Sequence, residues 1–180
     1  NDVIEHVADP RECLKKIFNL LTPGGIAYIE TVNKRSILNN IRDIHFGLFG
    51  INLLRHHSAS AAYRQLTGWG EYQVSDYYYS EWYVSNANAL GAKVSIPPSN
   101  DTFPSFHEAM REFTNKFYDW KVETSQRLDF YLRYEIEEKY YEYCRDINAA
   151  RMIAHADGDD KHFQSDWIDP LTRIVITKPL

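Results

Sequence analysis

The segment that most limits the possible folds is a capped helix followed by a glycine-rich turn and a β-rich stretch, within residues 9–32. Asp9 caps a helix whose first residue is Pro10, and Glu12 places a carboxylate in the first turn. Apolar residues then recur at helical spacing until Thr-Pro-Gly-Gly ends the helix. The stretch IAYIETV at 26–32 predicts a buried strand of the kind found in parallel sheets. This order of elements predicts an α/β fold.

The rest of the sequence predicts further helices and two more strands. Helical patterns cover residues 36–54, 80–90 and most of 104–154, and residues 56–79 predict an aromatic-rich loop or a short helix. β-rich segments lie at 92–96 and 171–178, and the second of them alternates. Within the longest helical stretch, the expected buried stripe consists of Leu128, Tyr131, Leu132 and Ile136.

Charge and cysteine content exclude several classes of protein. The net charge is −5 and the basic residues are scattered among acidic ones, so no nucleic-acid partner is expected. Cys13 and Cys144 lie far apart, which argues against a disulfide framework or a cysteine-rich zinc site and fits a cytoplasmic protein. No apolar run approaches about 18 residues, so no membrane span is expected.

The ordered motifs DVIEHVADP and LLTPGGIAYIETVN resemble the second half of class I S-adenosylmethionine-dependent methyltransferases. They are most similar to the branch that includes the ubiquinone-biosynthesis O-methyltransferases. YSEWYVSNANALGAKVSI adds a weaker match to the later helix-glycine-strand unit, and the final strand would be the family's antiparallel one. The resemblance implies the C-terminal part of a Rossmann-like sheet. Residues 1–97 and 169–180 would form its α/β core, and residues 98–168 a helical insertion before the last strand.

The resemblance also implies the activity, methyl transfer from S-adenosylmethionine to a small-molecule, lipid or glycan-type acceptor. In the family, a glycine-rich loop and a ribose-binding acidic residue would precede Asn1, and this sequence contains no Gly-x-Gly-x-x-Gly. We therefore expect a fragment that binds S-adenosylmethionine poorly by itself. The alternative is a noncatalytic interaction module built on a methyltransferase-like scaffold.

The candidate active-site residues stand at the start of the sequence, where the resemblance implies the carboxyl end of a strand. Ligands of open α/β sheets bind at such ends. Asn1 and Asp2 are expected to contact the cofactor, and Glu5 and His6 to act at the acceptor, for example as a base. Some family members carry Glu-x-x-Glu-His as a metal site, so Asp2, Glu5 and His6 are also candidate ligands of a divalent cation. The plainer alternative is that Glu5 and His6 only hold the loop before Asp9.

Residues after the strand at 26–32 are candidates for acceptor binding, because they would emerge on the same side of the sheet. The expected residues are Asn33, His45, His56, Trp69 and Tyr72. For each histidine the commoner alternative is a structural role. Most of the aromatic residues in GWGEYQVSDYYYSEW are expected in a core, with Trp69 and Tyr72 as exceptions.

The long helical segment and the strand at 26–32 also bear on assembly. The insertion leaves and re-enters the sheet near its ligand side, which favours a lid, a substrate-recognition cap or a dimer contact. The strand is expected at or near a sheet edge, where unpaired backbone groups attract another chain. We therefore expect the 180-residue chain alone to be poorly stable or to self-associate.

Overall fold

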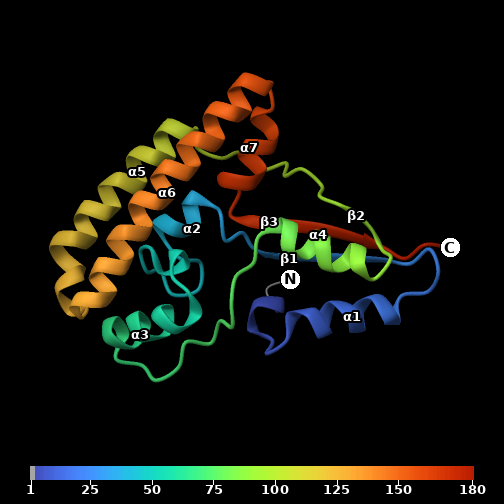
Figure 1. Ribbon diagram of the computed structural model, residues 1–180, viewed down its shortest axis with the longest axis horizontal. Helices are drawn as coiled ribbons and strands as arrows, with labels where there is room; N and C mark the ends of the chain where they lie inside the picture. Colours follow the sequence, from blue (N-terminus) through green and yellow to red (C-terminus); the bar gives the residue numbers. More distant parts are fainter. Residues whose placement is uncertain (1–2) are drawn as a thin grey trace.

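The computed structural model describes residues 3–180, in which a three-stranded sheet forms one end and packed helices form the other (Figure 1). The strands are β1 (Ile26–Val32), β2 (Lys93–Ser95) and β3 (Leu171–Thr177). The α-helices are α1 (Pro10–Leu20), α2 (Ile37–Ile41), α3 (His56–Thr67), α4 (Ser80–Ala89), α5 (Phe106–Asp119), α6 (Phe130–Asp157) and α7 (Asp160–Trp167). The short turns are η1 (Ile4–His6), η2 (Ile51–Leu53), the π-helical η3 (Trp120–Thr124) and η4 (Ser125–Arg127). The chain thus contains both helices and a sheet, as predicted, and the pairs in this small sheet are antiparallel.

The sheet has the last strand in its middle. The strand order is β1-β3-β2, and β3 runs antiparallel to both neighbours. In the register, Ile174 lies opposite Ile29, and Ile176 lies opposite Val94. Every second residue of β3 is buried, so the prediction of an alternating, antiparallel final strand is confirmed.

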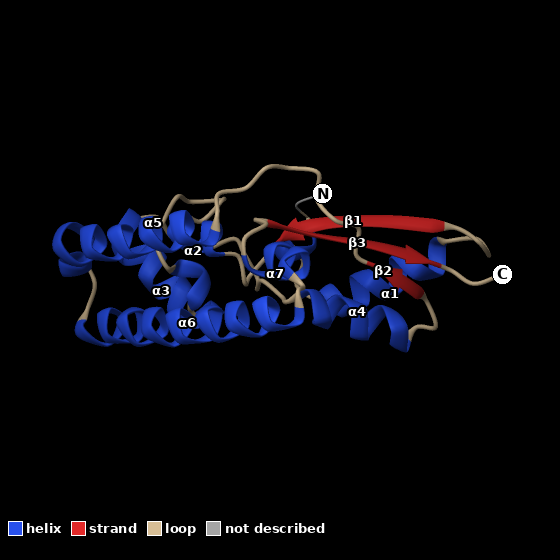
Figure 2. Cartoon of the chain, turned by 90° about the horizontal axis from the view of Figure 1, so that it is seen from above, coloured by secondary structure: helices blue, strands red, loops and turns tan. Residues whose placement is uncertain are grey.

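The first half of β1 is packed on one face, whereas the sequence predicts a strand buried on both. Helices α1 and α4 lie on the same side of the sheet (Figure 2), and Ile29 on that side joins their apolar cluster. Ile26 and Tyr28 point to the other side and are 64% and 50% exposed. Among residues 3–180, β1 pairs only with β3. The predicted edge position is therefore confirmed, and one uncovered face explains the exposure.

The first helix begins as predicted from its capping residues. The Glu12 backbone N–H donates to Asp9 Oδ1 at 2.9 Å, and Pro10 is the first helical residue. In the turn that follows, Gly24 adopts a left-handed conformation with φ +76° and its N–H donates to the Lys178 carbonyl at 2.9 Å. The Pro-Gly-Gly turn therefore also anchors the end of β3.

The opposite end of the molecule is built from helices. Helices α5 and α6 run side by side, and α2 and α3 lie next to them (Figures 1 and 2). Phe113 and Phe117 of α5 are buried against Tyr140 and Tyr143 of α6. The rings of Phe117 and Tyr140 stack with their centroids 3.7 Å apart. This aromatic contact fixes the α5–α6 pair.

The prediction of a mostly helical segment at 36–54 is wrong in its middle. Only α2 and η2 are helical there. Asp43 Oδ2 accepts hydrogen bonds from the backbone N–H groups of His45 and Phe46, at 3.0 and 2.7 Å. An aspartate that bonds nearby backbone in this way stabilises a turn in place of a helix.

The expected buried stripe, which begins at Leu128 just before α6, is confirmed except at Tyr131. Leu128, Leu132 and Ile136 are buried, whereas Tyr131 is 81% exposed. Neighbouring helical residues point about 100° apart, so Tyr131 cannot share the face of Leu132. The buried stripe continues instead through Tyr140.

Candidate functional site

Glu5 is a fully buried carboxylate at the carboxyl end of β1. It lies in η1 with 0% exposure. Thr31, near the end of β1, donates its hydroxyl to Glu5 Oε2 at 3.0 Å. The backbone carbonyl of Glu5 accepts hydrogen bonds from the Ser75 N–H and hydroxyl, both at 2.7 Å. η1 is thus held between the strand and the segment before α4, and Glu5 has a fixed position.

Two histidines complete a cluster with Glu5. His6 Nδ1 lies 2.9 Å from the Gln73 carbonyl oxygen, and its Nε2 lies 3.2 Å from His45 Nε2. His45 Nε2 is also 3.8 Å from Glu5 Oε1. Glu5 Oε1 is buried and accepts no hydrogen bond from any residue between 3 and 180. One ligand atom from each of Glu5, His6 and His45 lies within 4.8 Å of the other two.

Tyr77 and Asp43 fix the position of His45 through its Nδ1 side. The Tyr77 hydroxyl lies 2.8 Å from His45 Nδ1 and 3.1 Å from Asp43 Oδ1. Burial and the Asp43 carboxylate raise the pKa of Tyr77 well above its usual range, so the phenol stays protonated. Asp43 is 1% exposed and also caps the turn that carries His45. The ring of His45 is therefore oriented by a buried chain of polar groups.

Because Tyr77 has one hydroxyl proton, two proton arrangements are possible, each of which leaves one of these contacts without a hydrogen bond. In both, His6 donates Nδ1–H to the Gln73 carbonyl, since a carbonyl only accepts. In the first, His45 donates Nε2–H to His6 and accepts the Tyr77 hydroxyl at Nδ1. In the second, Tyr77 donates to Asp43, His45 donates Nδ1–H to Tyr77, and both Nε2 lone pairs face each other. The second arrangement suits a cation at the two nitrogens.

The cluster has the donor set of a metal site. Two imidazole nitrogens and one carboxylate are typical ligands of divalent first-row metals. Metal-binding histidines usually donate their second N–H to a carbonyl or another polar group, as the Gln73 carbonyl and the Tyr77 hydroxyl allow here. The unpartnered oxygen of Glu5 gives the third ligand. The residues present therefore fit a divalent cation.

Of the predicted site residues, three come together: Glu5 and His6, which were expected to act jointly, and His45, which was expected at the acceptor. Asn1 and Asp2, predicted to contact the cofactor, lie outside the described residues, and so does the predicted metal ligand role of Asp2.

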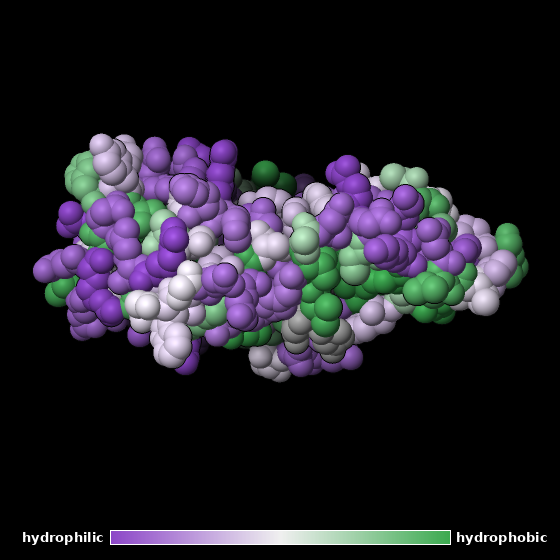
Figure 3. All heavy atoms as spheres, turned by 90° about the horizontal axis from the view of Figure 1, so that it is seen from below, coloured by the Kyte–Doolittle hydropathy of each residue, from purple (hydrophilic) through white to green (hydrophobic). Residues whose placement is uncertain are grey.

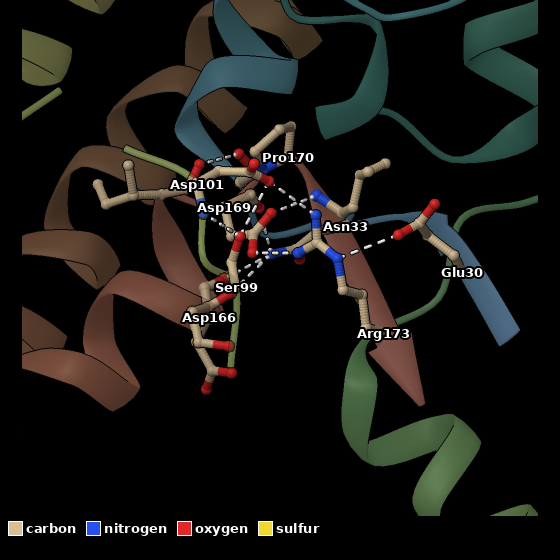
Figure 4. Close-up of polar contacts among 12 residues, drawn as sticks. Glu30, Asn33, Ser99, Asp101, Asp166, Asp169, Pro170 and Arg173 are labelled. Carbon is tan, nitrogen blue, oxygen red and sulfur yellow. Dashed lines mark hydrogen bonds and ion pairs between the residues drawn. The ribbon is translucent and has the colours of Figure 1, made fainter. Parts of the chain in front are cut away.

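Asn33 is occupied by structural contacts, which differs from the expected contact with the acceptor. Its amide nitrogen donates to the carbonyl oxygens of Ser165, Asp166 and Asp169 at 3.3, 3.0 and 2.8 Å (Figure 4). Its side-chain oxygen accepts from the Arg35 N–H at 2.9 Å. Asn33 is 4% exposed, and it joins the end of β1 to the end of α7.

Arg173, also drawn in Figure 4, contacts three carboxylates from separate parts of the chain. It lies 3.0 Å from Glu30 of β1, 2.5 Å from Asp169 and 3.1 Å from Asp101 of the segment after β2. Burial raises the pKa of Asp169, against the opposing effects of the Leu171 N–H and Arg173. This group ties the sheet to the two ends of the helical segment.

The other three candidates are not members of the cluster. Tyr72 is 9% exposed and packs on Phe46 and Tyr63, so it belongs to the core, contrary to the expected exception. Trp69 is 73% exposed in the loop after α3. His56 is exposed at the start of α3, with its ring centroid 6.0 Å from that of Tyr72.

Sequence reasoning did not identify Tyr77, Asp43 or Thr31 as part of the site. Asp43 carries a local signal, because a turn-forming aspartate stands two residues before a histidine. Tyr77 stands in a run of three tyrosines, and nothing in that run distinguishes it from its neighbours.

Comparison with known families gives one finding. Residues 1–87 match the family model of a methyltransferase domain. The matched segment is under half of the chain and contains Glu5, His6 and His45. No curated protein and no solved structure gives a significant match. In the described part of the chain, no helix has the length and apolar character of a membrane span.

Proposed function

We propose that the chain is part of a class I, S-adenosylmethionine-dependent methyltransferase with a Rossmann-like sheet, acting on a small-molecule, lipid or glycan-type acceptor. The observation that carries the proposal is the Glu5–His6–His45 cluster at the carboxyl end of β1, inside the segment that matches a methyltransferase domain. Its carboxylate is buried, and its His6 ring is exposed. The reversed last strand between two strands of like direction supports it. The similarity to the ubiquinone-biosynthesis branch, and the division into an α/β core and an insertion at 98–168, belong to this proposal.

The cluster would hold a divalent cation through Glu5 Oε1 and the Nε2 atoms of His6 and His45. When bound, such an ion orients an acceptor hydroxyl and makes it more acidic. Imidazole ligands favour first-row transition ions over Mg²⁺, which prefers oxygen ligands. Asp2 would be a further ligand.

The residues of the chain would act mainly by positioning. Methyl transfer from a sulfonium is an in-line displacement, so rate depends on aligning the nucleophile and on removing its proton. His6, whose Nδ1 is fixed by Gln73, presents its Nε2 to the centre of the cluster. In the proposed mechanism this nitrogen either receives the acceptor proton directly or helps to hold the cation.

Binding of S-adenosylmethionine would need sequence beyond these 180 residues, because they contain no Gly-x-Gly-x-x-Gly. We expect a version extended upstream to bind S-adenosylmethionine, and the 180-residue chain to show no measurable binding by calorimetry. Equal affinity of both forms would reject this part of the proposal.

Two measurements test the function itself. Calorimetric titration with Mn²⁺ should show one site that His45→Ala abolishes and that His57→Ala, at an exposed position of α3, leaves intact. In the extended protein, His6→Ala should lower turnover far more than affinity for S-adenosylmethionine. A protein without Mn²⁺ binding and with full turnover after His6→Ala would remove the cluster from the mechanism. An extended protein without methyl donor binding would favour the noncatalytic interaction module.

A further inference from the structure

A second site lies where the helical end meets the sheet end. A pocket of about 530 Å³ opens between the link from β1 to α2, η2, the middle of α6 and the ends of α4 and α7 that face them. Ligand pockets in proteins commonly measure about 300–1,000 Å³, so this one has room for a small organic molecule.

One wall of the pocket is aromatic and rigid. The guanidinium of Arg35 lies over the rings of Tyr79 and Trp167, 4.7 and 5.3 Å from their centroids. Arg35 also pairs with Glu81 at 2.7 Å. The Tyr143 hydroxyl donates to the Arg35 carbonyl at 2.7 Å. Because these groups hold one another, the wall is formed before any ligand arrives.

Most of the charges around the pocket are already neutralised. Lys34 pairs with Asp76 at 3.0 Å, and Lys139 pairs with Glu142 at 2.6 Å. Arg55 differs: its exposed side chain forms no hydrogen bond or ion pair with any residue in the described part of the chain. It is therefore the cation of the pocket that is available to an anion.

Asn52 contributes a polar group that lacks a partner. It lines the pocket but is only 2% exposed. Its Nδ2 donates to the Asn39 carbonyl at 3.0 Å, which fixes the orientation of the amide. Its Oδ1 accepts no hydrogen bond from residues 3–180. A buried acceptor without a donor is unfavourable, and a ligand hydroxyl would satisfy it.

We propose that this pocket binds a small hydroxylated organic anion, with its phosphate or carboxylate at Arg55, a hydroxyl at Asn52 and its body against Tyr79 and Trp167. That this ligand is the methyl acceptor rests on the function proposed above. The pocket and the Glu5–His6–His45 cluster share one chain segment, since Asp76 bonds Lys34 of the pocket and Tyr77 bonds His45.

Calorimetric titration without methyl donor or metal tests the pocket directly. The probes are glucose 6-phosphate for the phosphate source, glucuronate for the carboxylate source, and uncharged glucose and inorganic phosphate as partial ligands. We expect at least one of the two sugar anions to bind about tenfold tighter than either partial ligand, as a charge-assisted hydrogen bond implies. Which of them does so identifies the anionic group.

Two variants of equal charge change complete the test. Arg55→Gln should remove the advantage of the sugar anion over glucose. Arg64→Gln, an exposed arginine of α3 that is not part of the pocket wall, should preserve it. Equal binding of glucose and both anions, or equal losses in the two variants, would overturn the inference. This titration measures no methyl transfer. A protein that methylates an acceptor but fails the titration would therefore disprove the pocket proposal and leave the proposed function standing. A protein that passes it but transfers no methyl group rejects only the proposed function.

Discussion

The helical end and the sheet end of the molecule are stabilised in different ways. Among the described residues, the apolar cluster of the helical end has 23 buried members, and that of the sheet end has eight. The larger cluster is rich in stacked rings, whereas the smaller one is mainly aliphatic and lies on one face of the sheet. Figure 3 shows the surface of one face of the molecule, on which hydrophobic residues gather towards the sheet end and mainly hydrophilic residues cover the helices. The helical end buries its apolar side chains, and the sheet end leaves part of its own exposed.

The candidate site lies at the boundary between these two ends. Glu5 and Thr31 belong to the sheet end, while His45 and Tyr77 lie next to the helical core. The position of the site therefore depends on two apolar clusters of unequal size, one at each end of the molecule. Four substitutions test this difference.

Phe117→Ala should have the largest effect on stability. Phe117 is 1% exposed and stacked on Tyr140, and a buried phenylalanine reduced to alanine costs about 3–5 kcal/mol. Urea unfolding followed by circular dichroism measures the loss. The neighbouring Tyr118→Ala, at a position 60% exposed, is the control. For comparison, Ile176→Val in the apolar cluster of the sheet end should lower the free energy of unfolding by about 1 kcal/mol. Similar losses for Phe117→Ala and Tyr118→Ala would refute the account of the helical core.

Arg173→Met should cost about 3 kcal/mol, because it leaves the nearly buried Asp169 without its cation. Arg151→Met, which breaks an exposed pair with Asp160 at the helical end, should cost less than about 1 kcal/mol. Equal losses would show that the Arg173 group does not join the two ends.

The same variant has a predictable dependence on pH. Burial raises the pKa of Asp169 in the folded protein, so folding favours its protonated form. The stability deficit of Arg173→Met should therefore grow as pH rises through the folded pKa of Asp169 and shrink at lower pH. Adding Asp169→Asn should flatten this dependence in urea titrations across acidic pH. A deficit that is constant with pH would contradict this explanation.

Tyr77→Phe should weaken Mn²⁺ binding by about 10–100-fold, the usual effect of removing a group that orients a metal-binding histidine. Calorimetric titration gives the affinity, and circular dichroism checks that the fold persists. Tyr79→Phe is the matched control, since no hydrogen bond to its hydroxyl is present among residues 3–180. Unchanged affinity in Tyr77→Phe would show that the hydroxyl does not position His45.

Asp9→Ala should give the smallest effect, a loss of about 1 kcal/mol from the missing helix cap. Thermal unfolding measures it, with Arg11→Ala at an exposed site of the same helix as control. If the two variants melt alike, the cap adds nothing to the sheet end.

The elements predicted correctly are those with local signals. The Asp9-Pro10 start of α1 and the alternation of β3 depend on neighbouring residues, and both are confirmed. The turn at Asp43 is not predicted by helical propensity, because the Asp43 carboxylate bonds nearby backbone N–H groups and these bonds compete with the helix. The face of β1 was misjudged because its cover depends on where α1 and α4 pack.

The site was predictable only in part. Glu5 and His6 are adjacent in sequence, so their closeness in space follows from the motif itself. His45 is predicted only as a residue at the acceptor, and its contact with His6 depends on the path of the intervening chain. Tyr72 was expected outside the core, and its burial follows from the positions of Phe46 and Tyr63. Side chains brought together by tertiary packing carry no periodic signal.

The contact between His6 and His45 also has a consequence for folding, because it closes a loop between residues 39 apart in sequence. An ion shared by these rings would act as a reversible cross-link across β1 and α2, which lie within that loop. At a free concentration 100 times its dissociation constant, a ligand specific for the native state adds about 2.7 kcal/mol to stability. Chelation would then lower the melting temperature as well as the activity. The same three side chains would serve both in the reaction and as a cross-link that stabilises the fold.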